Sequence, residues 1–226
     1  MPTMTPTIDL LSPHSHNSLI YQTPEQQIAV TADFLEIGLE RDEQCVFLEM
    51  PEKLSMLRDT LKKRKIDTIS AEARGALMLS AKRDFLHHGK FDISRTLAFL
   101  ADSLEACLTQ GFSALRITGD LNWELGAEQN FQLLPEYESL LDQFVKEKQI
   151  VGLCQYQRYT VSSMAICNAL ETHENVILGN LFYPDNPYYE PPEIKLEKDA
   201  ARREQRRGEW RCRQLSKVTN ISEISI

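Results

Sequence analysis

Short apolar segments alternate with longer amphipathic segments between residues 18 and 182. The short segments are typical of buried strands, which we expect at residues 18–21, 45–50, 76–80, 114–118, 150–156 and 176–182. Apolar residues at helical spacing predict helices between them, at residues 24–39, 52–65, 92–110, 133–148 and 162–170. Buried strands joined by helices pack as a mainly parallel sheet covered on both faces. The sequence therefore predicts an α/β fold.

The turn between the first expected strand and the first expected helix, residues 22–27, argues against phosphate binding. Phosphate-binding loops at this position carry Gly-x-x-x-x-Gly-Lys-[Ser/Thr], whose backbone and lysine contact the phosphates. This turn holds neither glycine nor lysine, and Glu25 would repel an anion from the positive end of the helix. We therefore expect a chain that senses something rather than one that hydrolyses ATP.

Polar and aromatic residues lie at or just beyond the ends of expected strands, at the edge where such sheets bind ligands. These candidate site residues are Tyr21, Asp120, Trp123, Tyr156 and Arg158. Asp120 can accept a hydrogen bond from a ligand, and Trp123 can form an apolar wall. The alternatives are a structural ion pair between Arg158 and Asp120, and Trp123 as a residue that fills the core.

His14 and His16 precede the first expected strand as a His-x-His pair, which can present two imidazoles to a metal. Further ligands would have to come from distant residues such as His173, Cys154 or Asp120. Because no ligand spacing is visible, we favour His16 as a polar residue of a pocket and expect neither metal nor cofactor. A surface or capping histidine is the alternative. No motif for nucleophilic or zinc catalysis is present, so the chain is not expected to be an enzyme.

Composition limits the cellular compartment and the classes of partner expected for the chain. The five cysteines, Cys45, Cys107, Cys154, Cys167 and Cys212, form no Cys-x-x-Cys pair, which favours reduced thiols in the cytoplasm. No apolar run approaches the ~18–20 residues of a membrane span, and the first residues do not resemble a signal peptide, so no membrane partner is expected. The net charge is −8. Such an acidic chain disfavours nucleic acid as a partner.

The ends of the chain differ from its centre. Residues 1–13 are rich in Thr and Pro and expected to be flexible, and residues 14–182 to form the sensory domain. Residues 183–193 form a proline-rich arm. Residues 194–226 carry nine Lys or Arg and five Asp or Glu, with helical composition over 194–215. We expect that helix to be mobile and to order on a protein partner or a second copy, a solvated helix being the alternative.

Seven blocks in order resemble the MEDS domain, a sensory domain named for methanogens, methylotrophs and the dichloromethane-operon regulator. They are residues 16–21, 34–39, 43–46, 115–123, 137–138, 154–158 and 169–173. The resemblance implies a RecA/KaiC-like three-layer fold without a working ATP site, in prokaryotic proteins that sense small hydrocarbon derivatives. The ligand-binding residues that it implies are His16, Tyr21, Arg116, Trp123, Tyr156, Arg158 and His173. Asp120 stands where the resemblance leads us to expect Glu.

Three functions remain open from the sequence. The first is a non-enzymatic sensory domain that binds a small molecule near residues 16–21, 116–123 and 154–158. The second is a regulatory module that binds another protein through residues 183–226. The third is a degenerate ATPase or phosphotransfer enzyme, which the missing glycines and lysine disfavour.

Overall fold

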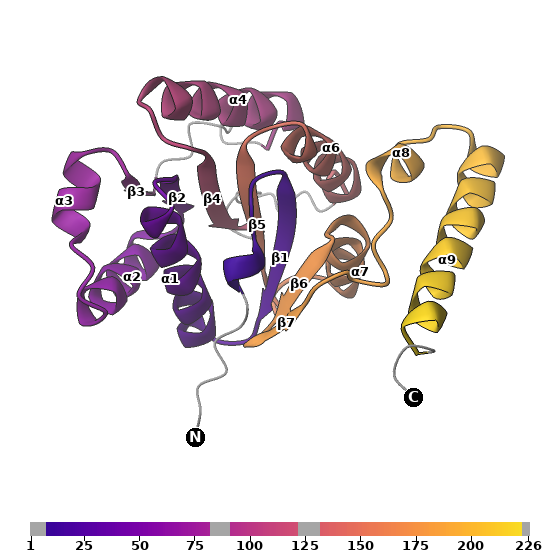
Figure 1. Cartoon of the computed structure of the whole chain (residues 1–226), viewed down its shortest axis with the longest axis horizontal. Helices are drawn as coiled ribbons and strands as arrows, with labels where there is room; N and C mark the ends of the chain where they lie inside the picture. Colours follow the sequence, from indigo (N-terminus) through magenta and orange to yellow (C-terminus); the bar gives the residue numbers. More distant parts are fainter. Residues whose placement is uncertain (1–7, 82–90, 122–131, 223–226) are drawn as a thin grey trace.

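One sheet of seven strands forms the centre of the molecule (Figure 1). The computed structural model describes residues 8–81, 91–121 and 132–222, and within them the strand order is β3-β2-β4-β5-β1-β6-β7. The strands are β1 Ser15–Tyr21, β2 Gln44–Leu48, β3 Leu77–Ser80, β4 Leu115–Asp120, β5 Ile150–Gln157, β6 Asn175–Leu178 and β7 Leu181–Tyr183. All neighbours pair in parallel except β6 and β7. The predicted mainly parallel α/β sheet is confirmed.

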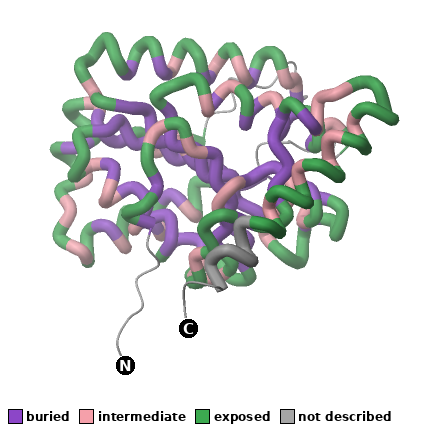
Figure 2. The backbone as a smooth tube through the Cα atoms, turned by 45° about the vertical axis from the view of Figure 1, so that its right-hand side comes forward, coloured by how far each residue is buried: buried purple, intermediate pink, exposed green. Residues whose placement is uncertain are grey.

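Helices cover both faces of this sheet. They are η1 Ile8–Leu10, α1 Pro24–Glu40, α2 Pro51–Lys63, α3 Thr68–Ala73, α4 Ile93–Thr109, α6 Leu134–Lys146, α7 Ser163–Thr172, α8 Pro192–Lys195 and α9 Ala200–Ser222. One apolar core packs α1 and α2 against the sheet, and a second packs α4, α6 and α7 against the opposite face. Figure 2 shows the buried residues concentrated in the central strands. The result is the predicted three-layer architecture.

Local sequence fixes where these helices begin and end. The Asp92 side chain accepts a hydrogen bond from the backbone N–H of Arg95, as predicted for the start of α4. Ser162 caps α7 in the same way. Gly111 follows α4 with a φ of 91°, a left-handed conformation that glycine adopts without a steric penalty.

Two expectations for the C-terminal part are wrong. Residues 176–182 form two strands, because Gly179 takes a left-handed φ of 61° and reverses the chain into an antiparallel β6–β7 pair. Residues 194–215 form two helices rather than one. The second begins where the Asp199 carboxylate accepts a hydrogen bond from the backbone N–H of Arg202, at 2.8 Å.

The proline-rich arm packs against the body. The Asn186 side chain donates hydrogen bonds to the carbonyls of Leu170 and His173. The Tyr189 hydroxyl donates to Asp142 Oδ2 at 2.7 Å, and its backbone carbonyl accepts from Trp210 Nε1 in α9 at 2.9 Å. α9 is therefore tied to the arm, not detached from it. None of the helices in the described ranges combines the length and apolar character that a membrane crossing needs.

Arg116 occupies a structural position beneath α1. Its side chain is fully buried, pairs with Glu43 and lies with its guanidinium carbon 4.6 Å from the centroid of the Phe34 ring. Gly38 of α1 packs directly on it. A Cβ added at Gly38 would lie 2.5 Å from Arg116 Cδ and 2.5 Å from Cys45 Sγ. These contacts leave no room for a larger residue.

We expect Gly38→Ala to lower the free energy of unfolding by about 1–3 kcal/mol, because buried side chains held by other contacts would have to move. Gly208→Ala in α9 is the matched control, since nothing lies within 4 Å of a Cβ added there. Alanine favours a helix over glycine by up to ~1 kcal/mol, so the control should not lose stability. Urea unfolding of the two variants measures both effects, and equal behaviour of the two would contradict the expectation.

Candidate functional site

The candidate site residues fall on opposite faces of the sheet. Side chains alternate along β1, so His16 faces α6 and α7, whereas Tyr21 belongs to the core beneath α1 and α2. β5 alternates in the same way and places Tyr156 with His16. The sequence therefore grouped residues that the fold divides between two sites.

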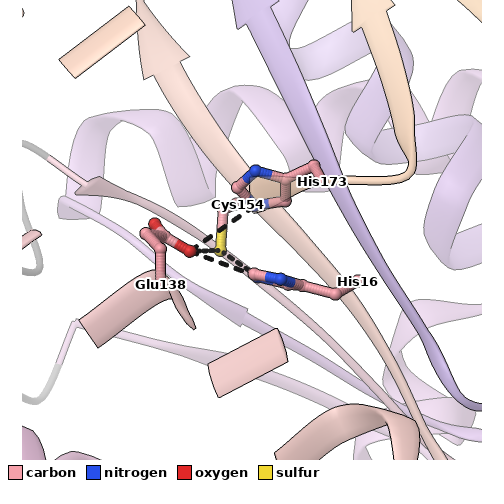
Figure 3. Close-up of side chains that lie close together, drawn as sticks. All are labelled: His16, Glu138, Cys154 and His173. Carbon is pink, nitrogen blue, oxygen red and sulfur yellow. Dashed lines mark hydrogen bonds and ion pairs between the residues drawn. The ribbon is translucent and has the colours of Figure 1, made fainter. Parts of the chain in front are cut away.

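The first site is a buried cluster of His16, Glu138, Cys154 and His173, named here the quartet (Figure 3). One donor atom from each residue lies within 4.8 Å of all the others. His16 Nε2 is 3.2 Å from Glu138 Oε2 and 3.3 Å from Cys154 Sγ. Glu138 Oε2 is 3.5 Å from His173 Nε2 and 3.7 Å from Cys154 Sγ. The four side chains come from β1, α6, β5 and the residue that follows α7.

His173 is held in one tautomer. Its Nδ1 lies 2.7 Å from the carbonyl oxygen of Ala169, and a carbonyl can only accept, so Nδ1 carries the proton. Its Nε2 points to the quartet and has no hydrogen-bond partner. Burial, reinforced by the positive charge of His16, lowers the pKa of His173 to about 4. His173 is therefore a neutral imidazole with a bare lone pair.

His16 has the opposite electrostatic character. Burial lowers its pKa, but contacts with Asp142 and Glu138 outweigh burial and raise the pKa to about 9. His16 Nδ1 lies 3.6 Å from Asp142 Oδ1. Burial raises the pKa of Glu138, but its hydrogen bond with His16 dominates and holds that pKa below its usual value. In this structure an imidazolium thus neutralises a buried carboxylate.

Tyrosines hold the carboxylates in place. The Tyr156 hydroxyl donates to Glu138 Oε1 at 2.6 Å, which leaves Oε2 for the quartet. Burial, together with the charge of Glu138, raises the pKa of Tyr156 well above its usual value, so the hydroxyl keeps its proton. The Tyr189 hydroxyl fixes Asp142 in a similar manner.

The second site lies on the other face, at the carboxyl ends of β1, β2 and β4. Tyr21 donates to Asp120, and Lys53 Nζ lies 3.0 Å from Glu49 Oε2 and 3.5 Å from Asp120 Oδ2. Gln27 donates to Glu49 at 2.9 Å. Burial, together with the charge of Asp120, raises the pKa of Glu49. The Lys53 ammonium group therefore pairs with the carboxylates of Glu49 and Asp120 at this site.

Three further candidates have different outcomes. Arg116 is a buried structural residue on the α1 face. Arg158 follows β5 with an exposed side chain, its guanidinium carbon 6.0 Å from the Tyr159 ring centroid. The Arg158–Asp120 ion pair is therefore wrong, and Lys53 takes that place. Trp123 lies outside the described residues. His14 is exposed and does not join His16 in the quartet.

Sequence reasoning gave no role to Glu138 and Lys53. Glu138 had a usable signal, because it falls within the apolar stripe of α6 formed by Leu134, Leu141 and Val145. A buried acid in such a stripe needs a partner. Lys53 had no comparable signal, because a lysine in the first turns of a surface helix is ordinarily solvated.

A small cavity adjoins the quartet between the sheet and helices α4 and α6. Its volume is about 40 Å³. Its wall is mainly apolar and includes Leu48, Leu100, Ile117, Tyr137, Leu141, Val145 and Cys154. Cys154 thus belongs both to the quartet and to the cavity wall.

Comparison with known proteins agrees with this architecture. The family model described as "MEDS: MEthanogen/methylotroph, DcmR Sensory domain" matches residues 15–174. The transcriptional repressor DcmR of Methylorubrum extorquens (strain DSM 6343 / CIP 106787 / DM4) is 28% identical over 169 residues, which cover 72% of this chain and 59% of the repressor. This chain therefore spans less than two thirds of that relative.

Among solved structures, the KaiC-like protein PH0186 from Pyrococcus horikoshii OT3 matches with a TM-score of 0.54 and 17% identity. The match covers 76% of this chain and 77% of that protein. At this identity the similarity concerns the fold alone, and it confirms the predicted KaiC-like architecture.

We expect Lys53→Met to lower the free energy of unfolding by about 3 kcal/mol at neutral pH, because Glu49 and Asp120 would lose their cation. Lys53 lowers the already raised pKa of Glu49, so its removal raises that pKa further. A carboxyl group with a raised folded-state pKa costs less stability as the pH falls and the group binds its proton. The deficit should therefore shrink between about pH 7.5 and about pH 5.

Lys62→Met, an exposed position on the same helix, is the control and should lose little stability at either pH. Urea unfolding at both pH values measures the difference. A Lys53→Met deficit that is absent, or that grows on acidification, would show that the ammonium does not neutralise these acids.

Proposed function

We propose that this chain, which belongs to the MEDS family of sensory domains, binds a small apolar molecule in the cavity beside the quartet. Family membership and similarity to a transcriptional repressor support a regulatory, sensory role. The proposal of an apolar ligand depends on the apolar cavity bordered by Cys154. The turn at residues 22–27, where related ATPases bind phosphate, lacks the glycines and lysine of a phosphate loop. The proposed activity is binding without chemical conversion.

The size and lining of the cavity support a small and weakly polar ligand. Its volume of about 40 Å³ exceeds the ~10–15 Å³ that one water needs. Leu100 and Leu141 form its wall, and Cys154 and Thr96 add few polar atoms. An apolar cavity of about 150 Å³ stays dry and accepts benzene, so this smaller cavity suits a smaller apolar molecule. A hydrocarbon derivative of a few heavy atoms suits this chemistry.

The second site supports the exclusion of nucleotides. Thr23 caps α1 through a hydrogen bond from the backbone N–H of Gln26, and the backbone N–H of Gln22 donates to the Gln26 side chain, so these two donors are used within the turn. Lys53 already neutralises Asp120, the acid that in ATPases of this fold would hold Mg²⁺. Tyr21 and Asp120 therefore serve in our proposal as a supporting network and not as ligand contacts. His16, Tyr156 and His173 remain with the ligand site.

The second candidate function is an interaction module that acts through the arm and α9. One chain of contacts favours it: His16 faces Asp142, Asp142 accepts from Tyr189, and the Tyr189 carbonyl accepts from Trp210. Leu215 of α9 is 68% exposed. A partner protein or a second copy of the chain would use this helix, and the contact chain would link it to the quartet.

We expect Leu100→Phe to fill the cavity and to abolish stabilisation by small apolar probes. Dichloromethane and 1-propanol are suitable probes, each followed by its effect on the melting temperature. A probe at ~100 Kd adds about 2.7 kcal/mol of stability to the wild type, an effect that the filled cavity should lose. Mg-ATP should stabilise neither protein.

Leu108→Phe is the matched control, because Leu108 lies on the same helix but is 41% exposed and outside the cavity wall. It should respond to the probes like the wild type. Equal responses of Leu100→Phe and the wild type would overturn the cavity proposal, and stabilisation by Mg-ATP would favour the ATPase interpretation.

We expect deletion of residues 199–226 to lower the free energy of unfolding by about 1–3 kcal/mol, contrary to the view of a detached helix. Glu190 is buried and pairs with Arg207 at 2.8 Å and Arg211 at 2.9 Å, so deletion leaves its carboxylate without those partners. Deletion of residues 217–226 alone keeps both arginines and should cost less. If both truncations unfold like the full chain, α9 is independent of the body.

A further inference from the structure

We propose that the quartet binds one divalent metal ion of Zn²⁺ type in a tetrahedral site. His16, Glu138, Cys154 and His173 each supply one donor atom. This inference goes beyond the sensing of an apolar molecule and does not rest on it. Imidazole, thiolate and carboxylate together are a donor set that suits Zn²⁺.

The distances between the donor atoms match such a site. Zn²⁺ lies about 2.0–2.1 Å from nitrogen, about 2.0–2.2 Å from carboxylate oxygen and about 2.3 Å from sulfur, so tetrahedral donors lie about 3.3–3.6 Å apart. Four of the six donor–donor distances run from 3.2 Å between His16 and Glu138 to 3.7 Å between Cys154 and Glu138, and the other two, from His173 to His16 and to Cys154, are at most 4.8 Å. Metal binding therefore needs only small side-chain movements.

The lone pair of His173 points to a missing ligand. His173 is completely buried, and its Nε2 is aimed at the other three donors without a hydrogen-bond partner. Its Nδ1–H donates to the Ala169 carbonyl, so in the neutral ring Nε2 carries no proton and can only accept. An unpaired buried polar atom destabilises the fold, whereas a metal ion would use that lone pair directly.

The groups behind the quartet are those that zinc sites commonly have. Metal-bound histidines usually donate their second N–H to a carboxylate or a carbonyl. Asp142 stands 3.6 Å from His16 Nδ1, and the Ala169 carbonyl accepts from His173 Nδ1. Tyr156 holds the far oxygen of Glu138. His173 and the Glu138 carboxylate are thus oriented before a metal arrives, and Asp142 lies just beyond hydrogen-bond distance of His16 Nδ1.

Charge balances with and without the ion. Without metal, the His16 imidazolium neutralises Glu138, and Cys154 lies near the same carboxylate as a thiol. Binding of Zn²⁺ would release one proton from His16 and one from Cys154 to solvent. The two positive charges of the ion would then face the carboxylate and the thiolate beside two neutral imidazoles. The four donors, with or without the ion, carry no net charge, and the neighbouring Asp142 carboxylate keeps its charge in both states.

A Cys–His nucleophile explains less of the arrangement. Cys154 and His16 are close enough for such a pair, at 3.3 Å. That interpretation gives no role to the unprotonated Nε2 of His173, which lies beside the other three donor atoms. Four protein donors instead give a closed metal site, the type that fixes structure rather than one that binds a reacting water.

The test uses the full chain with the exposed Cys167 and Cys212 replaced by serine, to remove adventitious thiol sites. Chelator-treated protein receives one equivalent of Co²⁺. We expect visible absorption of tetrahedral Co²⁺ together with a thiolate-to-cobalt charge-transfer band. Cys154→Ser should lose the charge-transfer band. Cys107→Ser should keep it, because Cys107 is buried on the same face but outside the quartet.

Zinc binding tests the other donors. We expect one Zn²⁺ per chain by elemental analysis, and at least a tenfold loss of Zn²⁺ affinity in Glu138→Gln and His173→Ala. Asp142→Asn keeps all four donors, and its Zn²⁺ affinity should fall by about 10–100-fold. This variant tests the proposal if circular dichroism shows that a donor variant does not fold. An octahedral Co²⁺ spectrum, or affinity unchanged in the folded variants, means an adventitious ion only and overturns the proposal. The Leu100→Phe result is independent of this outcome.

Discussion

The parallel pairing of β1 with β5 is the interaction on which the rest of this structure depends. It sets His16 opposite Gly152 and Ser18 opposite Cys154, in the middle of the sheet. Because side chains alternate along both strands, the same register sends one set of polar residues towards α6 and α7 and another towards α1. A shift by one residue would exchange the two sets and expose both cores.

The buried charges described above occur in compensated groups. Arg116 meets Glu43, Lys53 meets Glu49 and Asp120, and His16 meets Glu138 and Asp142. A buried ion pair adds little stability over a well-packed apolar pair, but loss of one partner is costly. These groups therefore act mainly as constraints, since any packing that separates the partners is strongly disfavoured. That constraint explains why these polar groups coexist in a small fold.

Sequence periodicity predicted the sheet and its main helices, because these depend on local patterns. The β6–β7 turn was missed, since a single glycine with positive φ decides it. The site was predicted in part: His16, Tyr156 and His173 meet, but Tyr21 and Asp120 lie across the sheet. Side-chain alternation along β1 and β4 decides that division. Which strands are neighbours then decides which residues meet on each face, and local sequence patterns do not carry that information. The expectation of no metal rested on the absence of any ligand spacing in the sequence, and it stays a prediction.

The sequence separation of the quartet residues determines the stage of folding at which the quartet forms. His16 and Cys154 are 138 residues apart, and the closest donors along the chain, Glu138 and Cys154, are still 16 apart. An unfolded chain therefore offers no local chelate, and the four donors meet only when strands β1 and β5 and helices α6 and α7 have assembled. A ligand of the quartet therefore binds the folded domain and not the unfolded chain. Its binding free energy then adds to the unfolding of the whole sheet, which makes occupancy a reporter of finished folding.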